Sequence, residues 1–163
     1  MRVYIPATVP MLKSLVADFE LAAVNGTAFA LTPSLRESYS AGDTEELEYA
    51  VMQEAARASL RLLAADPGAP RRRVVVSADV EVVHPRPDLD HAVVRLESAV
   101  TGDAVAAVHV DTSEAEDAVR AAAEMIDAAD LGDFDAEFAL GGAEDHELAW
   151  YAPQEVPFLL ELM

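Results

Sequence analysis

Residues 72–83 read RRVVVSADVEVV, and this stretch decides the fold class. Every second residue from Val74 to Val82 is apolar, and from Ser77 onward the residues between them are polar. A period of two is typical of a β-strand that has one covered face and one wetter face. The stretch therefore predicts one strand of a sheet whose second face is wet.

Two further runs show the same alternation, at about residues 91–101 and 104–111. The short connection Thr101-Gly102-Asp103 between them is typical of a tight turn. We therefore expect these two runs to be neighbours in the sheet and to pair antiparallel.

Apolar residues at helical spacing predict helices before and after these runs in the chain. The most regular stripe begins at Leu47 and continues for five turns to Ala65, behind an acidic N-terminal cap. A second helix is predicted from the capping box that starts at Ser113 to about Gly132.

The N-terminal part of the chain predicts a β-helix-β unit. Short strands at 3–6 and 27–31 flank a helix at about 9–20, which Thr8 can cap. The alternative is a hairpin at Asn25-Gly26, because this dipeptide is typical of a two-residue turn.

Beyond Gly132 the pattern is less regular, with strands expected near 135–140 and 146–151. All elements together predict one α+β domain over residues 1–163. We expect a mixed, largely antiparallel sheet with helices packed on one face, a variant of the ferredoxin-like fold.

Charge is the largest departure of this composition from the average. Thirty Asp and Glu oppose eleven Lys and Arg, which gives a net charge of −19. The imbalance is concentrated in residues 111–163, where fifteen acidic residues accompany the single base Arg120. Such a surface repels phosphate backbones and anionic membranes, which argues against binding to nucleic acid or membranes. The negative charge can then serve to bind cationic partners, to bind metal ions, or only to keep the protein soluble.

Several classes of function are made unlikely by missing residues and motifs. The chain has no cysteine, which excludes disulfides, thiolate zinc sites and cysteine nucleophiles. It shows no signal-peptide pattern, no apolar run of membrane length and no glycine-rich phosphate loop. We therefore expect a cytoplasmic protein with no cofactor and no bound metal.

The wetter face of the predicted sheet carries the first candidate site. His109 and Asp111 fall on one side of a strand, because side chains alternate with a period of two. A histidine beside a carboxylate can act as a general base or hold a divalent metal. The alternatives to a solvated face are dimerisation through it, or a small-molecule enzyme or metal-dependent hydrolase that uses His109 with Asp111 or Glu97.

The loop at residues 84–91 contains His84, Asp88, Asp90 and His91. These are ligand types for zinc and other divalent ions, but two prolines and polar side chains also suit an ordinary connection between strands. Whether this loop binds a metal is left open at this point.

Two charged segments have simpler interpretations. The triplet Arg71-Arg72-Arg73 is expected to pair with nearby acids, with ligand binding as the alternative. The acidic tract from Asp127 to Glu137 lacks the spacing of a calcium loop, so we expect it to be solvated.

Aromatic residues form the second candidate surface. Trp150 is the only tryptophan in a chain with 6% aromatic residues, and Tyr151 follows it directly. Such side chains combine a large apolar area with a polar tip, which suits pockets and interfaces. We predict either that Trp150 closes the core or that Trp150 and Tyr151 form a binding surface with Tyr39 and Tyr49.

Four segments form a recognisable set: RVYIPAT at 2–8, ELEYA at 46–50, RRVVV at 72–76 and WYAPQE at 150–155. Together they resemble an uncharacterised family of small actinobacterial proteins, a domain of unknown function, over nearly the whole chain. The resemblance implies a bacterial, cytoplasmic setting. It attaches no catalytic residue and no ligand to any position.

The leading hypothesis is therefore a protein of unknown function that acts as a non-enzymatic, cytoplasmic binding or interaction protein. Self-association into a homo-oligomer is one expected property, and no nucleic-acid or membrane partner is expected.

Overall fold

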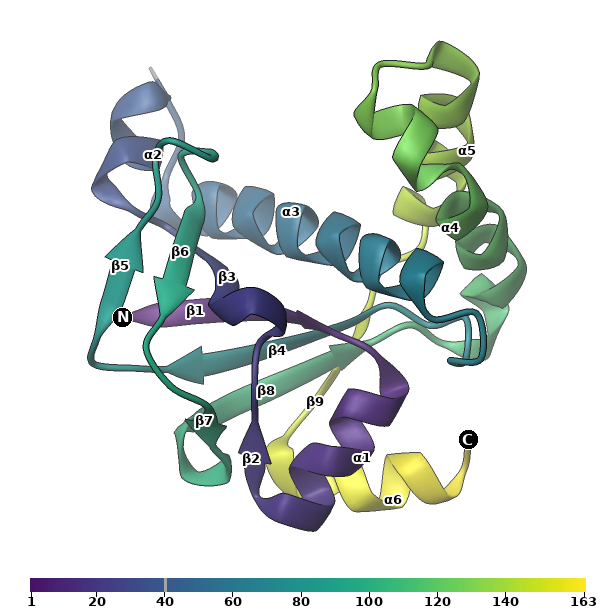
Figure 1. The fold of residues 1–163 in the computed structure, drawn as a ribbon, viewed down its shortest axis with the longest axis horizontal. Coiled ribbons are helices and arrows are strands. Elements are labelled where there is room, and N and C mark those ends of the chain that lie inside the picture. The colour runs from purple at the N-terminus through teal and green to yellow at the C-terminus, as the bar shows by residue number, and fades with distance from the viewer. Residues whose placement is uncertain (40) are drawn as a thin grey trace.

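The computed structural model describes residues 1–39 and 41–163, which form six α-helices, a seven-stranded sheet and a separate two-stranded sheet (Figure 1). The strands are β1 (Arg2–Ala7), β2 (Glu20–Leu21), β3 (Thr27–Ala30), β4 (Val74–Asp79), β5 (Val83–Pro85), β6 (Val93–Leu96), β7 (Val100–Thr101), β8 (Val105–Val110) and β9 (Ala149–Tyr151). The helices are α1 (Val9–Asp18), α2 (Pro33–Ser38), α3 (Thr44–Ala65), α4 (Glu116–Asp130), α5 (Phe134–Glu144) and α6 (Val156–Glu161). None of these helices has the length and apolar character that a bilayer crossing needs. The predicted α+β class with a largely antiparallel sheet is confirmed.

β1 is the central strand of the large sheet. The strand order is β5-β6-β3-β1-β4-β8-β9, and all neighbours pair antiparallel. β1 and β3, which flank α1 in the chain, pair directly, with Val3 opposite Ala30. The predicted β-helix-β unit is therefore present, but it lacks the parallel crossover of a ferredoxin-like fold. The alternative hairpin at Asn25-Gly26 does not form, because β2 pairs with β7.

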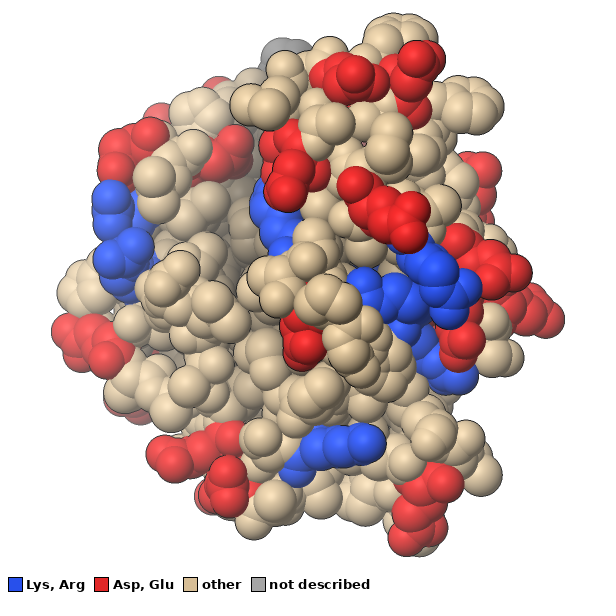
Figure 2. All heavy atoms as spheres, turned by 45° about the vertical axis from the view of Figure 1, so that its right-hand side comes forward, with Lys and Arg blue, Asp and Glu red and all other residues tan. Residues whose placement is uncertain are grey.

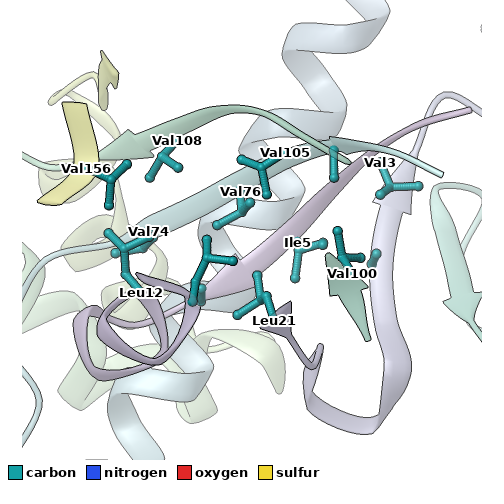
Figure 3. Packing of buried hydrophobic residues seen from close by; sticks show 14 of the residues in the cluster. Val3, Ile5, Leu12, Leu21, Val74, Val76, Val100, Val105, Val108 and Val156 are labelled. Atoms are coloured by element: carbon teal, nitrogen blue, oxygen red, sulfur yellow. The ribbon is translucent and has the colours of Figure 1, made fainter. Parts of the chain in front are cut away.

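One face of the sheet packs against α1 and α6. Alternate strand residues such as Ile5, Val76 and Val108 meet Leu12 from α1 and Val156 from α6 in one buried cluster (Figure 3). Ile5 lies directly opposite Val76 in the β1–β4 register. The alternation seen in residues 72–83 thus places these valines in the core.

The other face packs against α3. Tyr4 and Val75 of the sheet form a second cluster with Val51 and Ala55 of the helix. The helices are therefore divided between two faces, whereas the alternation predicted one covered face. The physical reason is visible in the run that starts at Val74, where three consecutive valines are fully buried, a pattern typical of a strand covered on both sides.

The predicted strand at 135–140 is wrong, because this segment lies in α5. Asp133 caps the helix by accepting a hydrogen bond from the backbone N of Ala136 at 2.8 Å. Ala136, Leu140 and Ala143 recur at helical spacing and pack against α4. The short apolar run around Leu140 can suit a strand or a helix, and the cap decides for the helix.

The predicted pairing of runs 91–101 and 104–111 is also wrong. β6 pairs with β3 and β5, whereas β8 pairs with β4 and β9. Gly102 begins a 3-10 turn rather than a hairpin, and its backbone N donates to the carbonyl of Phe19 at 2.8 Å. This bond holds the connection beside β2 and directs the two runs to different parts of the structure.

Candidate functional site

A shallow cleft of about 290 Å³ lies between α3 and the face of the sheet formed by β1, β4, β8 and β9. The helix supplies four residues at positions i, i+3, i+4 and i+7, which share one helical face: Glu45, Glu48, Tyr49 and Met52. The sheet supplies six residues: Arg2, Tyr4, Ser77, Ala107, His109 and Trp150.

Strand pairing brings the sheet residues of this cleft together. His109 of β8 lies directly opposite Trp150 of β9, and Ser77 of β4 lies opposite both Tyr4 of β1 and Ala107 of β8. Residues directly opposite one another project from the same face of a sheet. Trp150 is 61% exposed, and Tyr49 across the cleft is 55% exposed, so both rings are open to a ligand.

The cleft carries an excess of negative charge. Arg2 is matched by Asp79, with its Nε 2.7 Å and its Nη2 3.2 Å from the two carboxylate oxygens. Glu45 and Glu48 have no ion-pair partner within residues 1–39 and 41–163. The pKa of Tyr4 is raised, first by burial and then by the negative charge of Glu48. These charges favour a cationic group in the cleft over an anionic one.

His109 is neutral at physiological pH. Burial, with a smaller contribution from the positive charge of Arg2, lowers its pKa from 6.5 to about 4. Its Nε2 lies 2.9 Å from Oγ of Ser77. The imidazole therefore presents a polar but uncharged edge to the cleft.

Ser77 and His109 resemble the nucleophile and base of a covalent catalyst, but the pair is incomplete. Catalytic serines need an exposed Oγ and a base that a third group orients. Ser77 is only 2% exposed, and no carboxylate binds His109 in the described part of the chain. The arrangement suits recognition better than nucleophilic attack.

The predicted pairing of His109 with Asp111 or Glu97 does not occur. Asp111 is 1% exposed, and its two carboxylate oxygens accept from Nε and Nη2 of Arg73, both at 2.8 Å. Glu97 follows β6 and binds Nε2 of His84 at 2.9 Å. Three strands separate β6 from β8, a gap of roughly 19 Å at the usual strand spacing. The period of two does not extend to Asp111, because β8 ends at Val110, and Arg73 binds the carboxylate.

The predicted aromatic surface is divided among three places. Trp150 and Tyr49 both line the cleft, so the prediction that Trp150 closes the core is wrong. Tyr151 packs against the opposite face of the sheet, beside the cluster that contains Val108. Tyr39 lines a separate hollow of about 230 Å³ near Ala92.

The residues of the 84–91 loop separate in the same way. His84 binds Glu97, Asp88 binds Arg86, and Nδ1 of His91 lies 2.6 Å from Oγ of Ser34. The remaining member, Asp90, accepts from the backbone N of Ala92. Across the described residues, no three His, Asp or Glu side chains gather in a group that could hold a metal ion.

The arginine triplet is used within the protein itself. Arg71 donates to backbone carbonyls at the end of α3, Arg72 pairs with Glu116 at 2.9 Å, and Arg73 is buried with Asp111. Arg71 also lines a larger hollow of about 530 Å³, but its guanidinium already donates to backbone carbonyls. Within the described residues, the triplet therefore has no unpaired guanidinium to bind a ligand in this hollow. On the face drawn in Figure 2, Lys and Arg side chains lie mostly next to Asp and Glu side chains.

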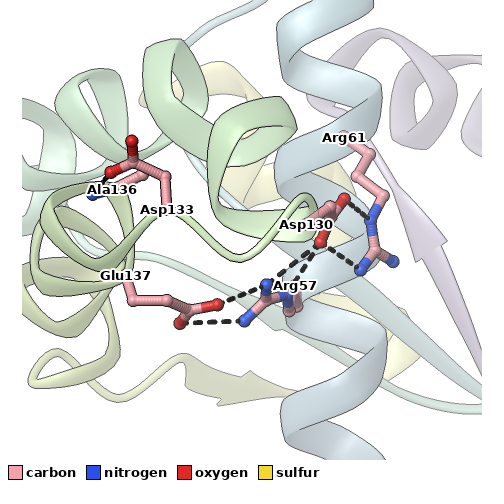
Figure 4. A network of polar contacts seen from close by, with 6 residues as sticks. All are labelled: Arg57, Arg61, Asp130, Asp133, Ala136 and Glu137. Atoms are coloured by element: carbon pink, nitrogen blue, oxygen red, sulfur yellow. Dashed lines mark hydrogen bonds and ion pairs between the residues drawn. The ribbon is translucent and has the colours of Figure 1, made fainter.

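Part of the acidic tract also binds arginines. Asp130 accepts from Arg57 at 3.0 Å and from Arg61 at 2.7 Å, and Glu137 accepts from Arg57 at 2.8 Å (Figure 4). These bonds lower the pKa of both carboxyls and raise that of Arg57. The tract thus joins α3 to α4 and α5, where only solvation was expected.

Besides Met52 and Ala107, the sequence did not identify five polar residues of the cleft: Arg2, Tyr4, Glu45, Glu48 and Ser77. The spacing of Glu45, Glu48 and Tyr49 was a usable signal, because it marks a second face of α3 beside the apolar stripe. Arg2 and Tyr4 had no such signal, since their role follows from the central place of β1.

Comparison with known proteins adds a family but no activity. Neither the curated proteins nor the solved structures include a match to this chain. One family model, described as a family of unknown function (DUF6912), matches residues 1–160. The chain therefore belongs to the DUF6912 family of unknown function.

Proposed function

We propose that this chain is a non-enzymatic, cytoplasmic binding protein whose cleft holds a small organic cation between Trp150 and Tyr49. One observation carries the proposal: two half-exposed aromatic rings face a cleft whose acids Glu45 and Glu48 have no ion-pair partner among the described residues. His109 adds a polar side chain to the cleft lining without adding charge.

Aromatic faces attract cations because the ring quadrupole is negative above its plane. Exposed sites of this kind contribute roughly 0.5–1 kcal/mol per ring. Two rings then favour a cation over a neutral molecule of the same shape by about five- to thirtyfold. Methylated ammonium groups fit this chemistry best, because they give up their water shell more easily than a primary ammonium does.

Trp150 is the only tryptophan, so its fluorescence reports on the cleft alone. Titration with choline is expected to change the Trp150 fluorescence along a saturable binding curve. The neutral isostere 3,3-dimethyl-1-butanol is expected to bind at least about fivefold more weakly. Tyr49→Ala and Glu48→Gln are expected to weaken choline binding. Tyr39→Ala is the matched control, since this tyrosine is 47% exposed and lines a different hollow. Equal binding of choline and its isostere would contradict the proposal.

The rival hypothesis is an enzyme that uses Ser77 and His109. This hypothesis predicts that the protein hydrolyses an activated ester such as p-nitrophenyl acetate. It also predicts that the variants Ser77→Ala and His109→Gln each lose this activity. We expect the same background rate in wild type and both variants. A rate that both substitutions abolish, in protein that keeps its fold, would replace the binding proposal with a catalytic one.

A further inference from the structure

The outer face of α5 is an apolar surface that no other part of the described chain covers. Leu131, Phe134 and Phe138 are 90%, 88% and 84% exposed. Phe134 and Phe138 are four residues apart, so their rings lie side by side along the helix. Gly141 and Gly142 continue the same face, and a Cβ added at either would meet nothing within 4 Å. The surface is thus two phenylalanine rings followed by a flat, open stretch of backbone.

This face is held in a fixed position. The opposite side of α5 is packed against α4 through Ala136, Leu140 and Ala143. Arg57 binds Glu137 at 2.8 Å, and Arg73 donates to the carbonyl of Ala143 at 2.9 Å. A rigid platform loses little conformational freedom when a partner binds.

The rim of the outer face carries five acidic side chains, and the arginine that binds one of them, Arg57 on Glu137, is shared with Asp130. Beyond Arg120 the chain contains no Lys or Arg. Exposed carboxylates surround the phenylalanines on both sides and at both ends of the helix: Asp133, Asp135, Glu137, Glu144 and Asp145. A second copy of this chain would bring the same negative charges into contact, and anionic lipids or nucleic acids would be repelled likewise.

We infer that the outer face of α5 is a docking surface for a basic amphipathic helix of another protein. The apolar stripe of that helix packs on Phe134 and Phe138, and its Lys and Arg side chains lie over the acidic rim. The two glycines allow the partner backbone to approach closely. This surface is distinct from the Trp150 cleft and does not depend on the proposed function.

The test uses a fluorescein-labelled synthetic peptide of about 18 residues, or five helical turns, with leucines at i, i+3, i+4 and i+7 and lysines elsewhere. Fluorescence anisotropy is expected to show saturable binding that weakens when NaCl is raised from about 50 to about 300 mM. Two control peptides are expected to bind at least about tenfold more weakly: one with glutamates in place of lysines, and one of the same composition with the leucine stripe scrambled.

The variant F134S/F138S is expected to lose at least about tenfold in affinity for the peptide. Both side chains are almost fully exposed, so its circular dichroism spectrum and melting curve should match the wild type. The matched control is Phe158→Ser, an exposed phenylalanine of α6, which is expected to bind like wild type. Equal binding of the scrambled peptide, or full affinity in F134S/F138S, would overturn the inference. Light scattering that shows a dimer would also overturn the inference, if F134S/F138S is monomeric. The same holds for adsorption to zwitterionic phosphatidylcholine vesicles that F134S/F138S abolishes.

Discussion

Loss of the Asp111 charge is expected to destabilise the fold strongly. Arg73 is 1% exposed, and four of its bonds hold the sheet and α5 together. Its guanidinium donates to both oxygens of Asp111 and to the carbonyls of Ala143 and His146, at 2.8 to 2.9 Å. Asp111→Asn keeps the shape of the side chain but leaves a buried positive charge without its counter-ion.

The expected cost is about 3–5 kcal/mol, the range for breaking a buried ion pair from one side. This is a large share of the roughly 5–15 kcal/mol that stabilises an ordinary domain. At about 2–4 °C for each kcal/mol in a chain of this length, the melting temperature should fall by roughly 6–20 °C. Urea unfolding followed by circular dichroism measures the free energy of unfolding directly.

Two further variants separate the loss of a buried charge from the loss of an exposed one. Asp88→Asn removes an exposed partner of Arg86 and should leave the unfolding midpoint unchanged. The double substitution Arg73→Met with Asp111→Leu removes both charges and should recover much of the lost stability. If Asp111→Asn proves no more destabilising than Asp88→Asn, the account of Arg73 as the buried link between the sheet and α5 is refuted.

Three further outcomes follow from the geometry. The His109 imidazole should titrate by NMR with a pKa of about 4. Because the folded state binds this proton more weakly than the unfolded state, the contribution of His109 to stability is complete above pH 6.5. It should fall by about 2–3 kcal/mol toward pH 4, a figure reduced for the partial exposure of the ring. Asp130→Asn should lower the free energy of unfolding in urea by about 1 kcal/mol at pH 7. The difference between wild type and variant should vanish as the pH falls through the lowered pKa of the Asp130 carboxyl. Gly102→Ala should lower the free energy of unfolding by about 1–2 kcal/mol, because an added Cβ would lie 2.4 Å from Cε1 of Phe19. In a double-mutant cycle, Gly102→Ala should have little effect when Phe19 is already replaced by Ala.

Local signals predicted the elements of this fold well. Thr8 caps α1 as its position indicated, and Asp43 caps α3 by accepting from the backbone N of Glu46 at 2.8 Å. These interactions join residues only a few positions apart, so the sequence displays both partners together. The wrong predictions concern partners that are distant in the chain. The turn at Gly102 suggested a local hairpin, but the pairing of β6 and β8 is decided by which strands surround β1.

The same distinction separates the predicted from the missed parts of the site. Trp150, Tyr49 and His109 were identified as chemically notable residues, but nothing in the sequence indicated that they share a cleft. Their meeting depends on the β8–β9 register and on the position of α3 over β1. Asp111 shows the opposite error, since the local periodicity suggested a partnership with His109 that Arg73 prevents. The arrangement of the whole chain as one domain stays a prediction.

The central position of β1 also has a consequence for the order of folding. This strand precedes the other eight in the chain, yet one of its two neighbours, β4, ends only at Asp79, opposite Arg2. Its α1 face is covered fully only when α6 contributes Val156 and Leu159. Such distant pairings make the contact order high, which slows folding and leaves nascent chains with an uncovered valine-rich face. We therefore expect truncated chains that lack α6 to aggregate.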